Sequence, residues 1–271
     1  MKNTIAVIMT VHNRRETTLE CIRRFYDGSD IENYDIDFYM MDDGSTDKTV
    51  EFVSLEFPEI IVLKGDGNLF WNRGMYECWK EAIKKHHDFY LWLNDDTMLF
   101  ENALEILFKN YEEAGVLSVI SGCCCDTKSQ NITTYGGRIN DVTVPMNGQL
   151  QRVETINGNC VLIPNIVVEK IGINDPYFLH SDGDFEYGFR ANKNGITTYI
   201  TSSFIGTCDR HDHVNKSMDA AYSLKDRIKF MNTPWGANPR EKFYLYNKYK
   251  GFWYAAKLCL RAYYRCLFPV K

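Results

Sequence analysis

The sequence has no excess of basic residues, no hydrophobic run long enough to cross a membrane and no cysteine pair at metal-ligand spacing. Its formal net charge is -5, whereas a protein that binds nucleic acid carries a basic footprint. Nucleic acid is therefore excluded as an expected partner. The apolar run at residues 5–11 is too short for a membrane span, and no small-residue cleavage site follows it. We predict that it is a buried parallel strand.

The nine cysteines do not have the spacing of a disulfide framework or a zinc site. Three of them, at 123–125, are consecutive, and none forms a C-x-x-C pair. An odd number of cysteines without a signal peptide indicates reduced thiols. We therefore expect a cytoplasmic protein, either free in the cytosol or at the inner face of the cell membrane.

Motifs of several common enzyme classes are also missing. The chain has no G-x-S-x-G segment, no P-loop and no complete G-x-G-x-x-G fingerprint. These absences argue against a hydrolase of the nucleophile-elbow type and against a dinucleotide-dependent oxidoreductase. The 45% of hydrophobic and 25% of charged residues are nevertheless ordinary for a folded domain.

The first hundred residues alternate between strand and helix patterns. Strands are predicted at 5–10, 35–41, 60–64 and 89–93, and helices at 15–26, 47–55 and 71–85. This alternation predicts an α/β fold with a mostly parallel sheet flanked by helices. Shorter strands follow from about residue 116. We expect one domain over 1–218, with halves at 1–100 and 101–218, and a helical C-terminal extension over 219–271.

Polar residues follow each of the four predicted strands, at 11–15, 42–47, 65–73 and 94–97. Ligands of open α/β sheets bind outside the carboxyl ends of the strands. The four clusters therefore predict one shared ligand site.

The strand at 89–93 ends in Asn94, Asp95 and Asp96. Magnesium takes one or two protein carboxylates and leaves its other positions to water and phosphate oxygens, so this pair could hold a cation against a diphosphate. Alternatively, the segment caps a helix that starts near Glu101. The residues alone leave both interpretations open.

A second acidic cluster, at 41–47, contains Asp42 and Asp43. Their carboxylates can accept hydrogen bonds from a base or a ribose, and Gly44 permits a sharp turn. Ser45 or Thr46 could cap the next helix at the same time.

The third cluster has acids at alternate positions, Asp182, Asp184 and Glu186, before a helix-like segment. One of them could act as a general base, and Arg190 could pair with Glu186 one helical turn away. A solvated helix start is the alternative. Farther on, His211 and His213 could supply a metal ligand or could stand on a surface turn.

In this order the clusters resemble the family 2 glycosyltransferases with the GT-A fold, over roughly residues 4–215. Residues 10–14 are similar to the family's T-x-x-N-R start, and 41–47 match its D-D-G-S-T-D segment, which contacts the nucleoside. Residues 67–74 resemble the G-N-x-G-x-x-x-G stretch of rhamnosyl- and galactofuranosyltransferase-like members, with Phe70 in place of the middle glycine. Residues 94–96 stand where the family has its D-x-D-type metal motif.

Two later segments extend the resemblance. Residues 156–164 are similar to the family's small-residue strand beside the acceptor. Residues 184–190 resemble its D-x-[DE]-x-x-x-R signature, whose leading aspartate is the catalytic base. Many relatives have an acid just before that aspartate, whereas this chain has Gly183 there and Asp182 one position earlier. The base is therefore Asp184 by resemblance, with Asp182 as the alternative.

The resemblance implies an inverting transfer from a nucleotide-diphosphate sugar to a hydroxyl of a glycan or lipid-linked acceptor, in bacterial surface polysaccharide assembly. It implies a Mg²⁺ or Mn²⁺ ion held by Asp96 and by His211, with His213 as the alternative histidine. The substrate-binding residues would be Thr10, Asn13, Arg14, Asp42, Asp43, Asn68, Trp71, Arg73, Asp95, Gly158 and Asp182. A sugar-nucleotide pyrophosphorylase and a non-catalytic glycan-binding module are the competing functions.

The C-terminal extension is basic and aromatic, with no acid between residues 243 and 271. Such a helix can lie in a bilayer interface, with its rings at headgroup depth and its cations near anionic lipid. Alternatively, it packs on the catalytic domain or in a homodimer. The sequence leaves the two alternatives open.

Overall fold

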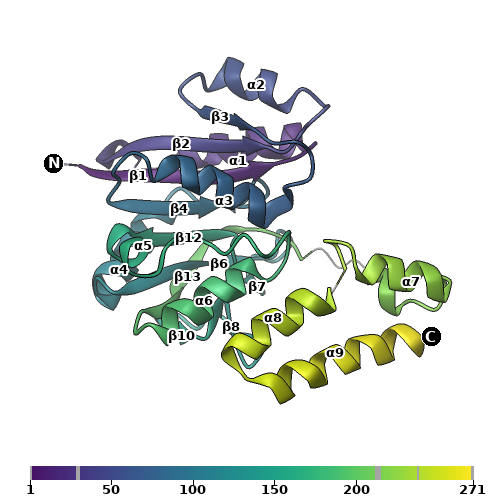
Figure 1. The fold of residues 1–271 in the computed structure, drawn as a ribbon. Coiled ribbons are helices and arrows are strands. Elements are labelled where there is room, and N and C mark those ends of the chain that lie inside the picture. The colour runs from purple at the N-terminus through teal and green to yellow at the C-terminus, as the bar shows by residue number, and fades with distance from the viewer. Residues whose placement is uncertain (1, 29–30, 211–214, 237, 270–271) are drawn as a thin grey trace.

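The α/β architecture expected from the sequence is confirmed. The structure is a computed structural model that describes residues 2–28, 31–210, 215–236 and 238–269. A curled central sheet carries helices on both faces, and the C-terminal helices lie beside one end of it (Figure 1).

The first half of the chain forms the parallel part of the sheet, with the strand order β4-β1-β2-β3. Each predicted strand and helix of this half is present, with ends shifted by three residues at most. Its elements are β1 (Asn3–Val11), α1 (Arg15–Tyr26), β2 (Tyr34–Asp42), α2 (Thr49–Glu56), β3 (Ile61–Lys64), α3 (Phe70–Ala82) and β4 (Phe89–Leu93), with a short 3-10 turn at Ile31–Asn33.

The second half extends the same sheet with mixed strand directions. β12 (Cys160–Pro164) runs antiparallel to both β4 and β6 (Ser118–Cys125), and β13 (Thr197–Thr207) runs parallel to β6. The remaining elements of this half are β5 (Met98–Leu99), α4 (Ala103–Ala114), β7 (Thr133–Tyr135), β8 (Gly137–Ile139), β9 (Val142–Thr143), β10 (Gln151–Val153), β11 (Thr155–Ile156), α5 (Asn165–Ile171) and α6 (Gly183–Lys193).

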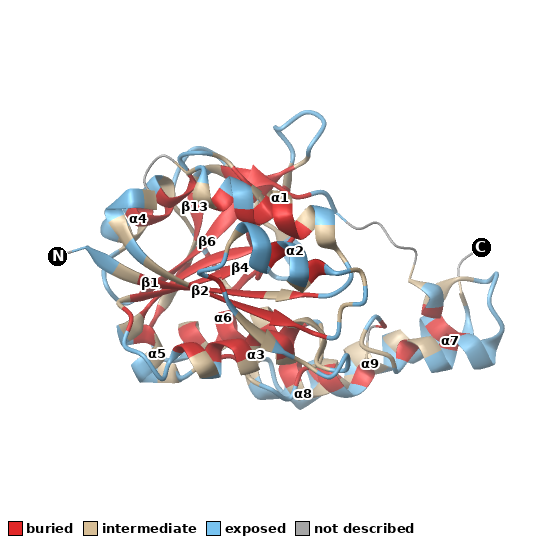
Figure 2. Ribbon diagram, turned by 90° about the horizontal axis from the view of Figure 1, so that it is seen from above, coloured by how far each residue is buried: buried red, intermediate tan, exposed pale blue. Residues whose placement is uncertain are grey.

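The core has two layers, one on each face of the sheet. Because side chains alternate along a strand, Val7 and Met9 of β1 enter one layer while Ala6 and Ile8 enter the other. Buried residues are concentrated along these central strands and the helices that cover them (Figure 2). All nine cysteines, which lie in the described part of the chain, are free thiols.

The C-terminal extension contains the helices α7 (Leu224–Met231), α8 (Pro239–Tyr249) and α9 (Phe252–Leu267), and a 3-10 turn, η2 (Lys216–Met218), precedes it. Phe178 and Phe189 of the sheet domain pack with Leu245 and Tyr246 of α8 in a small separate core. α9 runs back along α8 on the side away from the sheet (Figure 1). Among the described residues, no helix is long and apolar enough to cross a bilayer.

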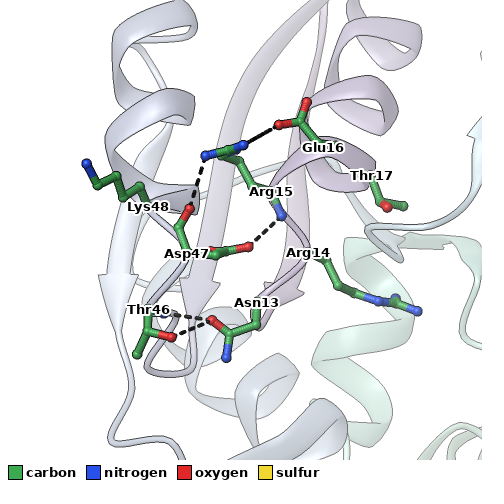
Figure 3. A pocket seen from close by; sticks show the side chains of 8 residues that line it. All are labelled: Asn13, Arg14, Arg15, Glu16, Thr17, Thr46, Asp47 and Lys48. Carbon is green, nitrogen blue, oxygen red and sulfur yellow. Dashed lines mark hydrogen bonds and ion pairs between the residues drawn. The ribbon is translucent and has the colours of Figure 1, made fainter.

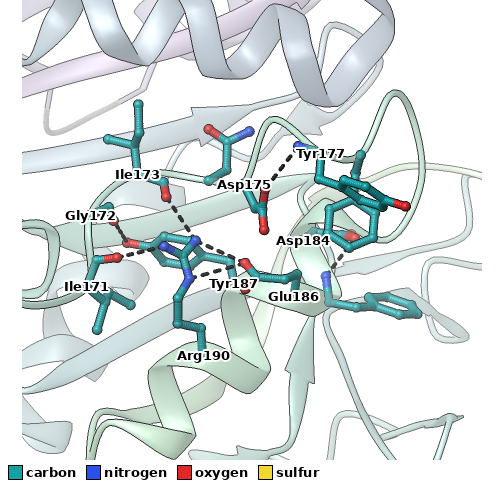
Figure 4. Close-up of polar contacts among 12 residues, drawn as sticks. Ile171, Gly172, Ile173, Asp175, Tyr177, Asp184, Glu186, Tyr187 and Arg190 are labelled. Carbon is teal, nitrogen blue, oxygen red and sulfur yellow. Dashed lines mark hydrogen bonds and ion pairs between the residues drawn. The ribbon is translucent and has the colours of Figure 1, made fainter. Parts of the chain in front are cut away.

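A buried carboxylate joins α8 to the sheet domain. The side chain of Glu186 on α6 is fully buried, and it accepts hydrogen bonds from Lys248 Nζ at 2.8 Å and from Tyr249 Oη at 2.6 Å. The expected pair with Arg190 is also present, at 3.0 Å. Arg190 in turn donates to the carbonyl oxygens of Ile171, at the end of α5, and of Ile173 just after it (Figure 4). Together with the bonds from Lys248 and Tyr249, these contacts join α6, the end of α5 and α8 in one network.

We expect Glu186→Ala to lower the free energy of unfolding by about 3–5 kcal/mol, because it leaves two cations without the buried charge that compensates them. Urea unfolding followed by circular dichroism measures the loss. The matched control is Glu20→Ala, which removes an exposed pair with Arg24 and leaves the free energy of unfolding nearly unchanged. Equal effects of the two substitutions would show that the network does not hold the extension.

Candidate functional site

One pocket of about 790 Å³ opens at the carboxyl edge of the parallel strands. Its walls come from the ends of β1, β2 and β4, the loop before α3, the segment between β11 and β12, and the start of α6. Nine of the residues predicted from the sequence line it: Thr10, Arg14, Asp43, Trp71, Asp95, Asp96, Gly158, Asp182 and Asp184.

The two acids that follow β4 share one cation. Arg14 Nη1 lies 2.8 Å from Asp95 Oδ1 and 2.9 Å from Asp96 Oδ2. Burial raises the pKa of Asp95 to about 6; the neighbouring Asp96 adds to this rise, and Arg14 opposes it. The next helix, α4, begins at Ala103 with Asn102 at its N-cap position. The helix-cap interpretation of residues 94–97 is therefore wrong.

The donor set at this point fits a hard divalent cation. Asp95 and Asp96 offer carboxylate oxygens beside an open pocket, which is the protein's usual share of a Mg²⁺ site beside a phosphate ligand. Within the described ranges, no group of three or more His, Cys, Asp or Glu side chains is placed to hold a metal. His211 and His213 lie outside the described residues, so the predicted histidine ligand has no structural account.

Asp43 organises the floor of the pocket. Its carboxylate accepts hydrogen bonds from the backbone N–H groups of Gly67, Leu69 and Phe70, at 2.8–3.2 Å. Asp42 instead accepts from the N–H of Ser45 and lies outside the pocket lining. These bonds fix the two loops that follow β2 and β3 against each other.

Helix α2, which follows the loop after β2, is not capped as expected. We expected Ser45 or Thr46 to cap it, but Asp47 accepts the hydrogen bond from the N–H of Thr49, the first residue of α2. Ser45 instead accepts from the N–H of Asn13, because the turn brings its hydroxyl to the loop after β1.

Phe70 has a backbone conformation that normally belongs to glycine. Its φ is +57°, in the left-handed region, which costs a non-glycine residue roughly 1–2 kcal/mol. This gives a physical reason for the glycine in the pattern that residues 67–74 resemble. The phenyl ring lines the pocket, 6.5 Å from the His180 ring and 6.0 Å from the Trp235 ring.

The neighbours of Phe70 divide between the pocket and the surface. Trp71 lines the pocket and donates through Nε1 to Asn94 Oδ1 at 2.7 Å. Asn68 is exposed and is bonded to Asp66, and Arg73 donates to the carbonyl of Pro176. Neither Asn68 nor Arg73 lines the pocket.

Asn13 faces a separate, shallower hollow, between the start of α1 and the loop before α2 (Figure 3). Its Oδ1 accepts from the N–H of Thr46 at 2.7 Å. Figure 3 also shows the side chain of Arg14 pointing away from Thr46, which agrees with its contact to the two acids after β4.

Asp184 lies in the opposite wall, at the first turn of α6. Its Oδ2 accepts from the N–H of Gly158 at 3.0 Å, and its Oδ1 from the N–H of Phe185 at 2.9 Å. Burial, together with the charge of Asp182, raises the pKa of Asp184 to about 6, while these two hydrogen bonds act to lower it. A carboxylate with this pKa is deprotonated at neutral pH and still basic enough to accept a proton.

Asp182 has a different environment from Asp184. Its Oδ1 lies 2.5 Å from Lys242 Nζ of α8 in an ion pair whose acid is almost fully buried. Between the two acids, a side chain at Gly183 would collide with Asn72, since a Cβ there would lie 1.9 Å from Asn72 Oδ1. Close packing of α6 on α3 therefore accounts for the glycine at this position.

Several lining residues were not predicted from the sequence. His180, Trp235 and Lys242 belong to no recognised motif, and the last two come from the C-terminal extension. The His180 and Trp235 ring centroids are 4.3 Å apart. Burial and, second to it, the charge of Arg14 lower the pKa of His180 to about 4, so the ring is neutral at physiological pH. The only sequence signal was the aromatic richness of the tail.

Comparison with known proteins adds a family and a fold. The family described as "Glycosyl transferase family 2" matches residues 6–165. No curated protein matches.

Two solved structures show the likeness in fold. TarS 1–349 from S. aureus has a TM-score of 0.56 at 12% identity, covering 86% of this chain and 66% of that one. The chain thus spans just under two thirds of the TarS structure. TarS has also been solved with UDP-GlcNAc. The mannosyltransferase PcManGT from Pyrobaculum calidifontis, solved with GDP-Man and Mn²⁺, has a TM-score of 0.55 at 12% identity, covering 97% of this chain and 75% of that one.

Proposed function

Because the chain belongs to glycosyl transferase family 2 and is a glycosyltransferase, we propose that it acts as an inverting enzyme. It would transfer a sugar from a nucleoside-diphosphate donor to a hydroxyl of a glycan or lipid-linked glycan. Surface polysaccharide assembly in a bacterium is the setting we propose, at the cytoplasmic side of the membrane. The observation that supports this proposal most strongly is that one pocket holds the half-buried carboxylate of Asp184, placed to act as a base, opposite a pair of acids suited to a cation.

Asp184 is the proposed base. As the acceptor oxygen attacks the anomeric carbon, its proton passes to the Asp184 carboxylate. The bond from that carbon to the donor diphosphate breaks, and its electron pair leaves with the nucleoside diphosphate. One such displacement inverts the anomeric carbon. The N–H groups of Gly158 and Phe185 hold the carboxylate in place, while Asp182 is already committed to Lys242.

Asp96 and Asp95 are the proposed holders of a Mg²⁺ or Mn²⁺ ion, which when bound supplies Lewis-acid stabilisation of the departing diphosphate. Arg14, already at the same acids, adds a second positive charge beside the donor. We further propose His211, outside the described residues, as a third ligand, with His213 as the alternative.

Donor contacts are proposed along the edge formed by β1 and β2. Thr10 Oγ1 is buried without a hydrogen-bond partner among the described residues, so it is free to bond a donor. Asp43 and Trp71 shape the floor. Asn13, Asp42, Asn68 and Arg73 remain in the proposed donor set, as residues that position the loops around this edge.

A glycan acceptor is supported by the aromatic mouth of the pocket. Phe70, His180 and Trp235 group their rings there, and the C–H faces of sugar rings stack on such surfaces. His180 Nδ1 is buried and has no partner in the described part of the chain, so it can bond a sugar hydroxyl.

Our first test concerns the metal and the donor together. A calorimetric screen of nucleoside diphosphates with Mn²⁺ should give one tight, metal-dependent binder. We expect Asp96→Ala to weaken that binding and to abolish transfer while the circular dichroism spectrum is unchanged. Activity of this variant in chelator-treated buffer would contradict the metal assignment.

A second test concerns the base. We expect Asp184→Asn to keep diphosphate binding while turnover falls by roughly 10²–10⁴-fold, because the amide cannot take the proton. The kcat/KM of the unaltered enzyme should fall as pH drops through about 6, where Asp184 becomes protonated. An inactive Asp182→Asn beside an active Asp184→Asn would transfer the role to Asp182.

The same substitution has a stability signature. Burial raises the folded-state pKa of Asp184 from 3.8 to about 6, so the unfolded chain releases this proton at a lower pH than the folded chain does. The free energy of unfolding is therefore unaffected by Asp184 below pH 3.8 and is lowered progressively as pH rises through 6. An asparagine is neutral throughout. The melting temperature of Asp184→Asn should therefore exceed that of the unaltered protein more at pH 8 than at pH 4, and an unchanged difference would contradict the burial argument.

A third test concerns the acceptor. Trp235→Ala should raise the KM for a soluble glycan acceptor about tenfold and leave diphosphate binding unchanged, since its ring lies at the mouth of the pocket. Trp253→Ala on α9 is the matched control, because this tryptophan is exposed and outside the pocket lining. A donor-binding defect in Trp235→Ala would place the ring at the donor instead.

A further inference from the structure

α9 packs with its small side chains inward. Ala255 and Cys266 are buried against α8 and α7, and Cys259 Sγ donates to the carbonyl of Pro239 at the start of α8. Tyr254 donates to Asp141 of the sheet domain at 3.2 Å. These contacts fix which side of the helix faces the protein and which side faces outward.

Four large apolar side chains of α9 lie together on its outward side. Trp253, Leu260, Tyr264 and Leu267 recur at i, i+7, i+11 and i+14, so they form one row along the helix. Their exposed fractions are 83%, 70%, 63% and 49%. Soluble monomers rarely expose an apolar row of this kind to water. Such a row indicates a surface that contacts a partner or a membrane.

A row of cations borders the apolar row. Lys257, Arg261 and Arg265 are four residues apart, are all exposed, and form no ion pair with an acid of the described residues. Lys257 precedes Leu260 by three residues and Arg261 precedes Tyr264 by three, so the two rows are neighbours on the helix surface. α9 contains no Asp or Glu.

We propose that this outward face of α9 docks on a bilayer that contains anionic lipid. The apolar row would enter the interface, and the adjacent cations would lie against the phosphate of the headgroups. Charge decides against a second copy of the chain as the occupant, because a copy of this face presents the same three cations and no acid to neutralise them.

The helix that packs against α9 also contributes to the pocket. α8, which carries α9, contributes Lys242 to the pocket wall and Lys248 to the buried network around Glu186. A membrane contact made by α9 is therefore connected to the catalytic site through α8. Truncation before α8 would remove both lysines, so point substitutions on α9 are the sharper test.

The test is sedimentation with vesicles of equal parts phosphatidylglycerol and phosphatidylcholine at low salt. The full chain should pellet with these vesicles and remain in the supernatant with phosphatidylcholine alone. K257Q/R261Q/R265Q should bind the anionic vesicles roughly a hundredfold more weakly, at about fivefold per cation, from about 1 kcal/mol each. Trp253→Ser with Leu260→Ser should weaken binding while leaving the charge unchanged.

The matched control is K109Q/K128Q/K170Q, which removes the same charge from exposed lysines elsewhere and should bind as the unaltered chain does. Transfer to a soluble acceptor should be unchanged in every α9 variant, which separates docking from catalysis. The proposal is overturned if the full chain stays in the supernatant with anionic vesicles, or if the α9 charge variant binds normally. It is equally overturned if the α9 substitutions break a dimer, detected by light scattering, without changing vesicle binding.

Discussion

Neutralisation of the acids at the end of β4 is the interaction on which the site depends. β4 pairs in parallel with β1, with Ile8 opposite Trp92, so the loops that follow these two strands emerge side by side. Without a cation, two adjacent and largely buried carboxylates, Asp95 and Asp96, would destabilise the folded state at this edge of the sheet. Arg14, from the loop after β1, supplies the positive charge and holds both carboxylates toward the pocket.

Close approach of backbone segments gives the opposite wall its shape. A Cβ at Gly158 would lie 2.4 Å from the Trp71 ring, and one at Gly183 would overlap Asn72. Gly158 lets the Trp71 ring of α3 approach the segment between β11 and β12, and Gly183 lets Asn72 of α3 approach the start of α6, where Asp184 lies. The N–H of Gly158 is also one of the two backbone donors to the Asp184 carboxylate. Burial in this wall is the main cause of the raised pKa of Asp184, and the charge of Asp182 also raises it.

The C-terminal extension contacts the site with one side and, in our proposal, lipid with the other. Its inner side completes the site, because Lys242 neutralises Asp182 and Trp235 closes the aromatic mouth. Its outer side, on α9, is the surface that we propose docks on lipid. The two alternatives that the sequence left open for the tail are therefore compatible, because α9 packs on the protein through Ala255, Cys266 and Tyr254 while its row of exposed apolar side chains and its cations face outward.

The sequence by itself determined the α/β order, the limits of α1 and β4, and the clustering of polar residues at the strand ends. These follow from local periodicity and from the rule that parallel strands end at one edge. Only the tertiary structure decided which acid is committed to an ion pair, since Lys242 is sixty residues from Asp182. It also decided that Trp235 enters the pocket while Asn68 and Arg73 do not. Such choices depend on contacts between distant segments, which no local pattern of residues records.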